Sequence, residues 1–416
     1  MHAAASRLQS EPVRRWRQAL LATLLGLVGG AASAVDWTGR ISLLGGASHP
    51  SSGDAGNGVA GTPTADQQSL RLMAQDQDES AEWSVHVKTS RQNTRGLVGS
   101  GAHASALFRW RTLADESRSG DGVSRATSIG WELDRAVYKL RFDQATLALG
   151  RQPVDFGSGR FWQPLNVFGA FAPTDLDTDF KPGIDGAVLT VYPSAFSSLS
   201  AVVALAPYGQ SAIDHSAALH YQRQVGETSQ LALLASHVVG QRQFGASFES
   251  DWRGVGWRIE GLHTRPEGGR PGSLFWILGV DYQFDIGTLV ALEWHDDARG
   301  ATREAALPTV AATRPMVLGL QQQMARRVLG LSVQKDLTPL WNASYTVLAT
   351  SLRAADGGRS PSLLHQISLL RSLGNESDLL LALSIGTGKG LGPTGALRSS
   401  FGHLPATLTV RWRMYF

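Results

Sequence analysis

The last eleven residues of the chain alternate between apolar and polar side chains. Counting back from the terminus, the apolar set is Phe416, Met414, Trp412, Val410 and Leu408. The polar set between them is Tyr415, Arg413, Arg411, Thr409 and Thr407. Because successive side chains of a β-strand point to opposite faces of the sheet, this pattern predicts a strand with one apolar and one polar face. A soluble sheet over a core would show the same split, so this segment alone does not decide the fold.

The same alternation runs through upstream segments such as 81–91, 135–143 and 254–264. A tilted strand needs about ten residues to cross a bilayer, and each of these segments has that length. Strands of soluble sandwiches are typically shorter, at about five or six residues. Strand length therefore favours a transmembrane sheet over a sandwich.

Eighteen segments are predicted as strands, and sixteen is the alternative number. They are 37–46, 68–76, 81–91, 135–143, 145–152, 183–193, 198–207, 215–224, 228–239, 242–250, 254–264, 273–284, 287–297, 326–336, 341–352, 362–373, 377–387 and 406–416. Connections after odd-numbered strands include the long ones, which are 92–134, 153–182, 298–325 and 388–405. Those after even-numbered strands are short. Short turns at one rim and long loops at the other predict an all-β protein, a transmembrane antiparallel up-and-down β-barrel with both termini on the periplasmic side.

Backbone hydrogen bonding is the physical reason for a closed sheet. In hydrocarbon every amide must find a partner within the protein, and a sheet achieves this only by closing on itself. A barrel of this many strands encloses a lumen too wide for wall side chains to fill. We therefore expect an aqueous channel or a bore occupied by loops.

Residues 1–34 have the order of a secretory signal peptide. Four arginines precede the apolar run 19–28, and Ala32-Ser33-Ala34 supplies a cleavage site. An uncleaved anchor is the alternative, but the apolar run is shorter than the ~20 residues of a spanning helix. Removal of the signal takes four of the 38 basic and one of the 35 acidic residues and leaves 34 of each in 35–416. The mature chain is formally neutral, which gives no reason to expect nucleic acid as a partner.

Composition and motifs give little support to an enzyme. The chain has no Cys, which excludes thiol chemistry and cysteine-ligated metals. The Gly-Ser-Gly at 157–159 is not the Gly-x-Ser-x-Gly of a nucleophile elbow, and the glycine-rich 386–390 lacks the P-loop pattern. The histidines are scattered and show no metal-ligand spacing. We expect a protein without enzymatic activity, cofactor or metal.

Charged residues fall on the polar face of several predicted strands. If the apolar face meets lipid, the lumen wall carries Arg71, Lys88, Lys139, Arg141, Arg258, Glu260, Arg411 and Arg413, together with Arg40, His86, Glu249, Asp281 and Glu293. Basic residues outnumber acidic ones in this set, and rings of Arg or Lys favour anions. The alternative is that opposite charges pair across strands and only hold the lumen open.

The connection 153–182 is rich in glycine, proline and aromatic residues. A long loop of this kind is usually functional or disordered, and its aromatic side chains need a surface to pack on. We expect it to fold into the lumen and narrow it. Its candidate constriction residues are Arg151, Asp155, Arg160, Trp162, Asp175, Asp177, Asp179 and Lys181. Asp175, Asp177 and Asp179 alternate along the chain, which suits either a hard cation such as Ca²⁺ or ion pairs with wall arginines.

The terminal strand, the signal peptide and the strand pattern together resemble Gram-negative outer-membrane porins. This resemblance implies that Leu408, Val410, Trp412, Met414 and Phe416 form the C-terminal signal read by the barrel-assembly machinery. More loosely, the long loop and the wall arginines are similar to alginate-export-type barrels.

The implied function is passive diffusion or export of small or oligomeric polar solutes through the cell outer membrane, with anions favoured. The implied partners are outer-membrane lipid, the assembly machinery and the solute, and a homo-oligomer is compatible with the resemblance. The alternative is a structural barrel or sleeve for a periplasmic or outer-membrane partner, without an open pore.

Overall fold

Nineteen strands of one antiparallel sheet make up most of the described chain. The structure is a computed structural model that describes residues 35–49, 62–96, 104–120, 125–210, 213–266 and 271–416. The strands are β1 (Asp36–His49), β2 (Thr64–Gln77), β3 (Ala81–Arg95), β4 (Ala114–Gly120), β5 (Arg125–Phe142), β6 (Ala145–Gln152), β7 (Ile184–Ser194), β8 (Ser197–Ala204), β9 (Ser216–Val225), β10 (Ser229–Val238), β11 (Gln241–Trp252), β12 (Val255–Pro266), β13 (Ser273–Gln283), β14 (Thr288–Asp297), β15 (Arg327–Thr338), β16 (Trp341–Arg353), β17 (Arg359–Gly374), β18 (Ser377–Thr387) and β19 (Ala406–Tyr415). The predicted signal peptide, 1–34, lies outside the described residues.

Helical segments are few and short in the described chain. They are η2 (Ala104–Phe108), η3 (Glu304–Ala306), α2 (Leu307–Ala311) and α3 (Arg314–Val317). No helix among the described residues has the length and apolar character needed to cross a bilayer.

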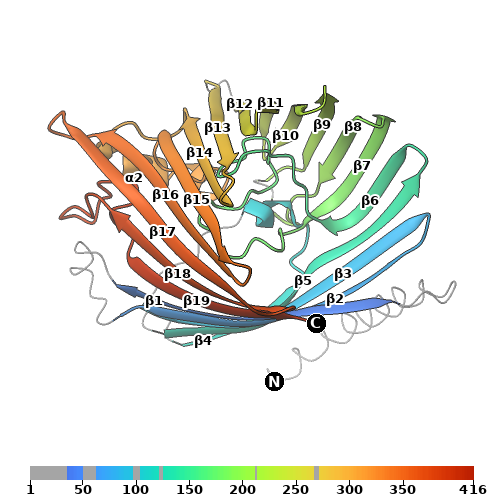
Figure 1. Cartoon of the computed structure of the whole chain (residues 1–416), viewed down its shortest axis with the longest axis horizontal. Helices are drawn as coiled ribbons and strands as arrows, with labels where there is room; N and C mark the ends of the chain where they lie inside the picture. Colours follow the sequence, from blue (N-terminus) through green and yellow to red (C-terminus); the bar gives the residue numbers. More distant parts are fainter. Residues whose placement is uncertain (1–34, 50–61, 97–103, 121–124, 211–212, 267–270) are drawn as a thin grey trace, which may run out of the picture. The chain divides into compact units, whose positions relative to one another are not determined.

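The sheet closes on itself through its first and last long strands. Apart from β4, each strand pairs antiparallel with the next strand of the barrel (Figure 1), and β19 pairs with β1 in a ladder from Arg40↔Tyr415 to His49↔Ala406. The N–H of Gly39 donates to the carbonyl of Phe416 at 2.7 Å, and the reverse bond is 3.0 Å. A Cβ at position 39 would lie 2.3 Å from the Phe416 ring, so glycine allows the terminal aromatic to pack there. Closure thus reaches the last residue of the chain.

Eighteen strands form the barrel and β4 is an addition. One side of β5 pairs with β3. On its other side, residues 126–132 pair with β4 and residues 136–142 pair with β6. The sequence prediction of eighteen barrel strands is therefore confirmed, and the alternative of sixteen is set aside. The largest boundary difference is in the predicted loop 92–134, which contains β4 and the first part of β5, since β5 begins at Arg125. Because of this longer β5, the β3–β5 ladder continues toward the long loops, beyond the point where the pairing of β5 with β6 ends.

The two faces of the sheet differ as the alternation predicts. Large apolar side chains point outward and are exposed, among them Leu43, Leu72, Leu189, Leu233, Ile259, Leu278, Ile367, Leu381, Leu408 and Val410. Inward neighbours on the same strands are buried and often charged, such as Arg40, Arg71, Glu260 and Arg411. This is the arrangement of a barrel whose outer face meets lipid.

Connections are short at one rim and long at the other. The short rim has turns such as 143–144, 195–196 and 253–254, and the long rim carries 153–183, 298–326 and 388–405. A single tight turn, Val239–Gly240, occurs on the long rim, where both residues have positive φ of 49° and 72°. Positive φ at both central residues is typical of the type I′ hairpin turn.

The outward face gives a direct stability test. Leu381 lies at the middle of β18 and is 44% exposed. We expect Leu381→Arg to lower the free energy of unfolding in lipid vesicles by about 2–4 kcal/mol, the cost of a lipid-facing arginine near the bilayer centre. Ser384→Arg, on the lumen side of the same strand, should cost much less. Equal losses in urea titrations of the two variants would contradict the assignment of the faces.

Candidate pore constriction

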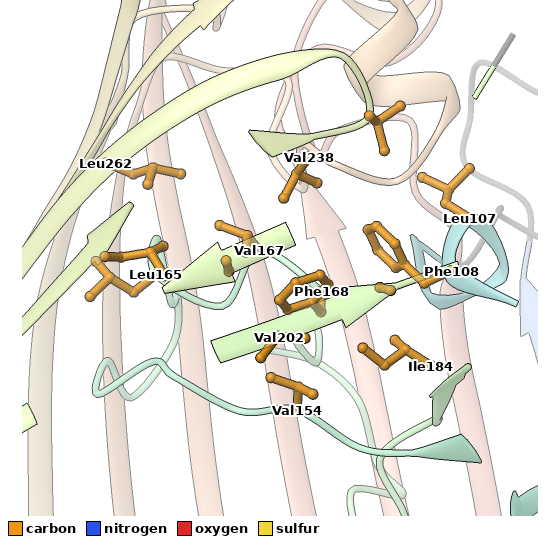
Figure 2. Packing of buried hydrophobic residues seen from close by; sticks show 14 of the residues in the cluster. Leu107, Phe108, Val154, Leu165, Val167, Phe168, Ile184, Val202, Val238 and Leu262 are labelled. Atoms are coloured by element: carbon orange, nitrogen blue, oxygen red, sulfur yellow. The ribbon is translucent and has the colours of Figure 1, made fainter. Parts of the chain in front are cut away.

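The connection 153–183 between β6 and β7 runs inside the barrel, as the sequence analysis predicts. Its first part packs on inward side chains of β7 to β12 (Figure 2). Four loop residues, Val154, Leu165, Val167 and Phe168, share a buried cluster with the wall residues Ile184, Val202, Ala204, Ala218, Ala232, Leu234, Val238 and Leu262. The inner wall on this side is thus apolar, whereas a wall that faced water would carry polar side chains. Burial of this apolar surface is what attaches the loop.

The next loop residues join a second apolar cluster. Phe161 and Trp162 pack against inward residues of β13 to β17, namely Ile277, Ala291, Val328, Leu348, Leu352 and Leu364. A Cβ at Gly330 of β15 would lie 3.1 Å from the Phe161 ring, so this glycine leaves room for the ring. Leu307 and Val310 of the connection 298–326 belong to the same cluster. A second long connection therefore also folds inward, which the sequence analysis did not predict.

Two buried carboxylates of the wall bind the loop backbone. Glu293 of β14 accepts the N–H groups of Arg160 (2.9 Å), Phe161 (3.1 Å) and Trp162 (2.9 Å). Glu260 of β12 accepts the N–H of Ser158 at 2.8 Å, its hydroxyl at 2.9 Å and the N–H of Leu165 at 2.5 Å.

Both carboxylates are almost fully buried, with exposures of 0% for Glu260 and 1% for Glu293. A buried carboxylate is tolerated only when it is hydrogen-bonded, and these two are bonded by the loop. Each therefore needs the loop in place, and the loop needs each carboxylate.

The later part of the loop meets a cationic wall on the opposite side. Arg40 of β1 binds both carboxylate oxygens of Asp177, each at 2.8 Å. It also binds one carboxylate oxygen of Asp179 at 2.7 Å. Asp179 also accepts from Arg413 and Tyr415 of β19. In addition, Arg411 donates to the carbonyl of Leu176. The loop thus spans from the apolar wall to the strands where the barrel closes.

The two loop aspartates are held in the ionised state. Burial alone would raise the pKa of Asp177, but the hydrogen bond and positive charge of Arg40 hold it below its ordinary value. Burial likewise opposes ionisation of Asp179, yet its bond from Tyr415 and the charge of Arg413 lower its pKa. Protonation of either group requires a pH below the ordinary aspartate range, so the contacts persist through neutral and mildly acidic pH.

Phe180 adds an aromatic contact to the same wall. Its ring centroid lies 4.8 Å from the guanidinium carbon of Arg40 and 4.2 Å from that of Arg71. His86 of β3 meets the ring edge-on, with centroids 6.0 Å apart. These cation–π contacts fix the end of the loop next to the arginines without neutralising them.

Lys181 is the one predicted loop cation with a strongly altered environment. Its ammonium donates to Asn166 at 2.8 Å and lies 3.3 Å from Asp155. Burial lowers the pKa of Lys181 to about 8, although the charge of Asp155 opposes the shift. Its charge therefore changes within a pH range that is accessible to experiment.

Two other predicted constriction residues, Arg160 and Asp175, have different surroundings. Arg160 reaches Asp281 of β13 at 3.1 Å, and Arg258 of β12 binds the same carboxylate. Asp175 accepts the N–H of Ala172 at 2.7 Å within the loop. Among the described residues no group of three or more His, Asp or Glu could hold a metal ion.

Arg151, another predicted constriction residue, is held by contacts with the neighbouring strand and with two backbone carbonyls. It lies opposite Asp185 in the β6–β7 ladder and binds that carboxylate at 2.6 and 2.8 Å. Its remaining donors bind the carbonyls of Leu133 (2.6 Å) and Arg111 (2.7 Å). The preceding Gly150 has a φ of 113°, which interrupts the regular alternation of β6. Arg151 is consequently buried within the wall, with 3% of its surface exposed.

The predicted lumen-wall cations differ in how completely they are paired. Arg71 binds Asp134 at 2.6 Å. Near the short rim, Lys139 and Arg141 share Glu82, at 3.6 and 2.6 Å.

Lys88 stands apart from these pairs. It faces Arg71 across one ladder and Glu132 across the other. Within the described part of the chain it makes no hydrogen bond or ion pair, and it is half-buried.

Several residues of the site carry no signal in the sequence pattern. Arg109, just after η2, binds Glu132 and reaches Asp134 at 3.4 Å. Asp378 of β18 binds Arg413 at 2.5 Å. Asp378 is polar at an inward position, so alternation could have identified it, but Arg109 lies in a segment without strand pattern.

Comparison with known proteins gives neighbours in structure alone. No family model matches the chain, and no curated protein matches its sequence. Acinetobacter baumannii OccAB4 aligns with a TM-score of 0.59 and 11% identity over 92% of this chain and 99% of that chain. Pseudomonas aeruginosa OpdK, solved with vanillate, aligns with a TM-score of 0.55 and 12% identity over 92% and 98%.

Pseudomonas aeruginosa OccK7 (OpdD) aligns with a TM-score of 0.52 and 13% identity over 92% and 98%. OpdK is described as an outer membrane protein. At these identities the likeness shows the fold alone, which is the eighteen-stranded antiparallel barrel of outer-membrane porins. None of these neighbours is an alginate-export protein, so that narrower resemblance gains no support.

The anchoring role of Glu293 can be tested by removing its carboxylate. Glu293→Ala would leave three loop N–H groups without partners, each at a cost of about 1–3 kcal/mol if they stay buried. We expect the loop to detach, giving a larger and noisier single-channel current and faster proteolysis within 157–165. Glu249→Ala is the matched control, because Glu249 also faces inward but has no described bond to the loop. Identical currents in the two variants would contradict the anchor.

Proposed function

We propose that the chain is an outer-membrane channel through which small polar solutes diffuse, with a preference for anions. The observation that carries this proposal is the meeting of the inward loop with the cationic wall. This wall carries Arg40, Arg71, Lys88, Arg411 and Arg413, which lie on adjacent strands around the point of closure. Diffusion through such a pore needs no catalytic group, because charge, bore width and loop position set what passes.

An outer-membrane location follows from the barrel surface. A closed sheet has all its backbone groups hydrogen-bonded in lipid. In water its apolar outer face would remain exposed, which is unfavourable because of the hydrophobic effect. The outward positions of Leu408, Val410, Trp412 and Met414 and the terminal Phe416 fit the proposed assembly signal. Residues 1–34 would direct export of the chain.

The anion preference rests mainly on Lys88. The arginines of the wall are largely compensated by Asp134, Asp177, Asp179 and Asp378. Lys88 makes no ion pair among the described residues: its cross-strand neighbours are Arg71 and Glu132, and Glu132 is bound by Arg109. A cation without an ion-pair partner in a pore raises the local concentration of anions. The neighbour OpdK was solved with vanillate, an organic anion of the size class we propose.

Conductance in planar bilayers tests the channel and the role of Lys88 together. We expect wild-type protein to give open current with a reversal potential displaced toward anions. Lys88→Gln should move the reversal potential toward cations while leaving the loop contacts unchanged. Silence at all voltages would instead favour the structural sleeve.

Lys335→Gln is the matched control for this substitution. Lys335 lies on the outward face of β15 near the short rim, away from any ion path. It should leave selectivity as in the wild type. An equal displacement in both variants would mean that Lys88 does not border the path.

The pH dependence of selectivity tests the position of Lys181. With a pKa of about 8, Lys181 is mostly protonated at pH 7 and mostly neutral at pH 9. The site therefore becomes more negative as the pH rises, and we expect the anion preference to fall with a midpoint near pH 8. Lys181→Gln should show the high-pH selectivity throughout. A flat profile in the wild type would place Lys181 away from the ion path.

A further inference from the structure

A pocket of about 70 Å³ lies between the two inward connections and the wall. The loop 153–183 contributes Trp162, Gln163 and Asn166, and the connection 298–326 contributes Gln321 and Gln322. The wall supplies Gln241, Gln243, Leu262, Phe275, His295 and Asp297 from β11 to β14. This pocket is on the far side of the loop from the cationic wall, because residues 162–170 line it while 176–180 contact the arginines.

Three lining residues carry buried polar atoms that have no partner in the described structure. They are Nε1 of Trp162, Nδ1 of His295 and Oε1 of Gln321. Exposure of these residues is 0%, 2% and 5%, respectively. An unsatisfied buried polar atom is costly, so three around one cavity indicate that a polar occupant completes their hydrogen bonds.

The lining is uncharged overall. Asp297 is neutralised by Arg299, whose guanidinium binds it at 2.6 and 2.9 Å. The remaining polar side chains are amides, one imidazole and one indole. An ion would find no compensating charge here, which favours a neutral occupant.

The unpaired atoms require both donors and acceptors from that occupant. The indole N–H of Trp162 donates, Oε1 of Gln321 accepts, and Nδ1 of His295 does either according to its tautomer. A hydroxyl group both donates and accepts. The rings of Trp162 and Phe275 flank His295 at centroid distances of 4.9 and 4.8 Å and offer apolar faces to C–H groups.

We propose that this pocket is a binding subsite for an uncharged polyhydroxy compound, or for the hydroxyl-bearing end of a larger solute. The subsite rests on the proposed function, because it serves a solute that reaches it through the channel. At roughly 10–15 Å³ for each water-sized probe, the pocket holds about five non-hydrogen atoms, or about five waters. The test must therefore separate a bound polyol from water alone.

Uptake of radiolabelled xylitol into proteoliposomes provides that test. Uptake is divided by the chloride current of the same preparation, so that differences in the amount of folded channel cancel. In wild type the rate should saturate with xylitol concentration, whereas free diffusion gives a straight line. Gln321→Leu and Trp162→Phe should each raise the half-saturating concentration by about fivefold, the effect of one lost neutral hydrogen bond.

Gln334→Leu is the control, because this inward amide of β15 lies outside the pocket. Its uptake curve should match the wild type. A linear wild-type curve would show that only water fills the pocket. An unchanged half-saturating concentration in both pocket variants would contradict the assigned hydrogen bonds. Either result overturns the subsite while the chloride current still supports the channel. Absence of chloride current overturns the channel itself and the subsite with it.

Discussion

The pairing of β19 with β1 is the interaction on which the rest of the structure depends. In hydrocarbon an unpaired backbone group costs several kcal/mol, and no water is present to replace the missing partner. The ladder from His49↔Ala406 to the bonds between Gly39 and Phe416 removes both edges of the sheet. Once the sheet is closed, side chains must separate into lipid-facing and lumen-facing sets. That separation places arginines from distant parts of the sequence on one inner wall.

The closed barrel has a wide bore with a partly apolar inner wall, and the long loop covers that wall. An eighteen-stranded barrel has too wide a bore for wall side chains to fill, and here much of the inner wall from β7 to β12 is apolar. The loop covers this wall with Leu165 and Phe168 and presents its backbone N–H groups to Glu260 and Glu293. Neither contact type would suffice alone: apolar packing sets no register, and a buried carboxylate without donors would be unstable. Together they fix which loop residues reach the opposite side.

Period-two alternation predicted the strands well because lipid imposes it on every membrane-crossing segment. The sequence analysis nevertheless assigned the first part of β5 to a loop. The alternation is present there, since Ile129, Trp131 and Leu133 alternate with Gly130, Glu132 and Asp134, and the segment pairs with both β3 and β4. Alternation also carries no information on the surroundings of Arg151, which binds Asp185 of β7 directly after Gly150, a residue with positive φ.

The loop contacts were beyond sequence reasoning for a different reason. Asp179 and Arg413 are 234 positions apart, and only the closed topology brings them together. Composition indicated that the loop needs a packing surface, and alternation placed Arg413 and Glu260 inward. Neither could say which acid meets which base, because that choice depends on how far the loop extends before it turns back to β7.

The two sides of the loop divide the lumen into unlike chemical environments. Residues 176–180 lie against guanidinium groups that are engaged in ion pairs and a cation–π contact, whereas Lys88 on the same wall makes no ion pair among the described residues. The pocket that residues 162–170 help to line presents amides and aromatic rings with no net charge. A solute that carries both an acidic group and hydroxyl groups would find a complementary surface on each side. Because one continuous loop borders both environments, any change that releases it from Glu260 and Glu293 should alter charge selectivity and polyol recognition together.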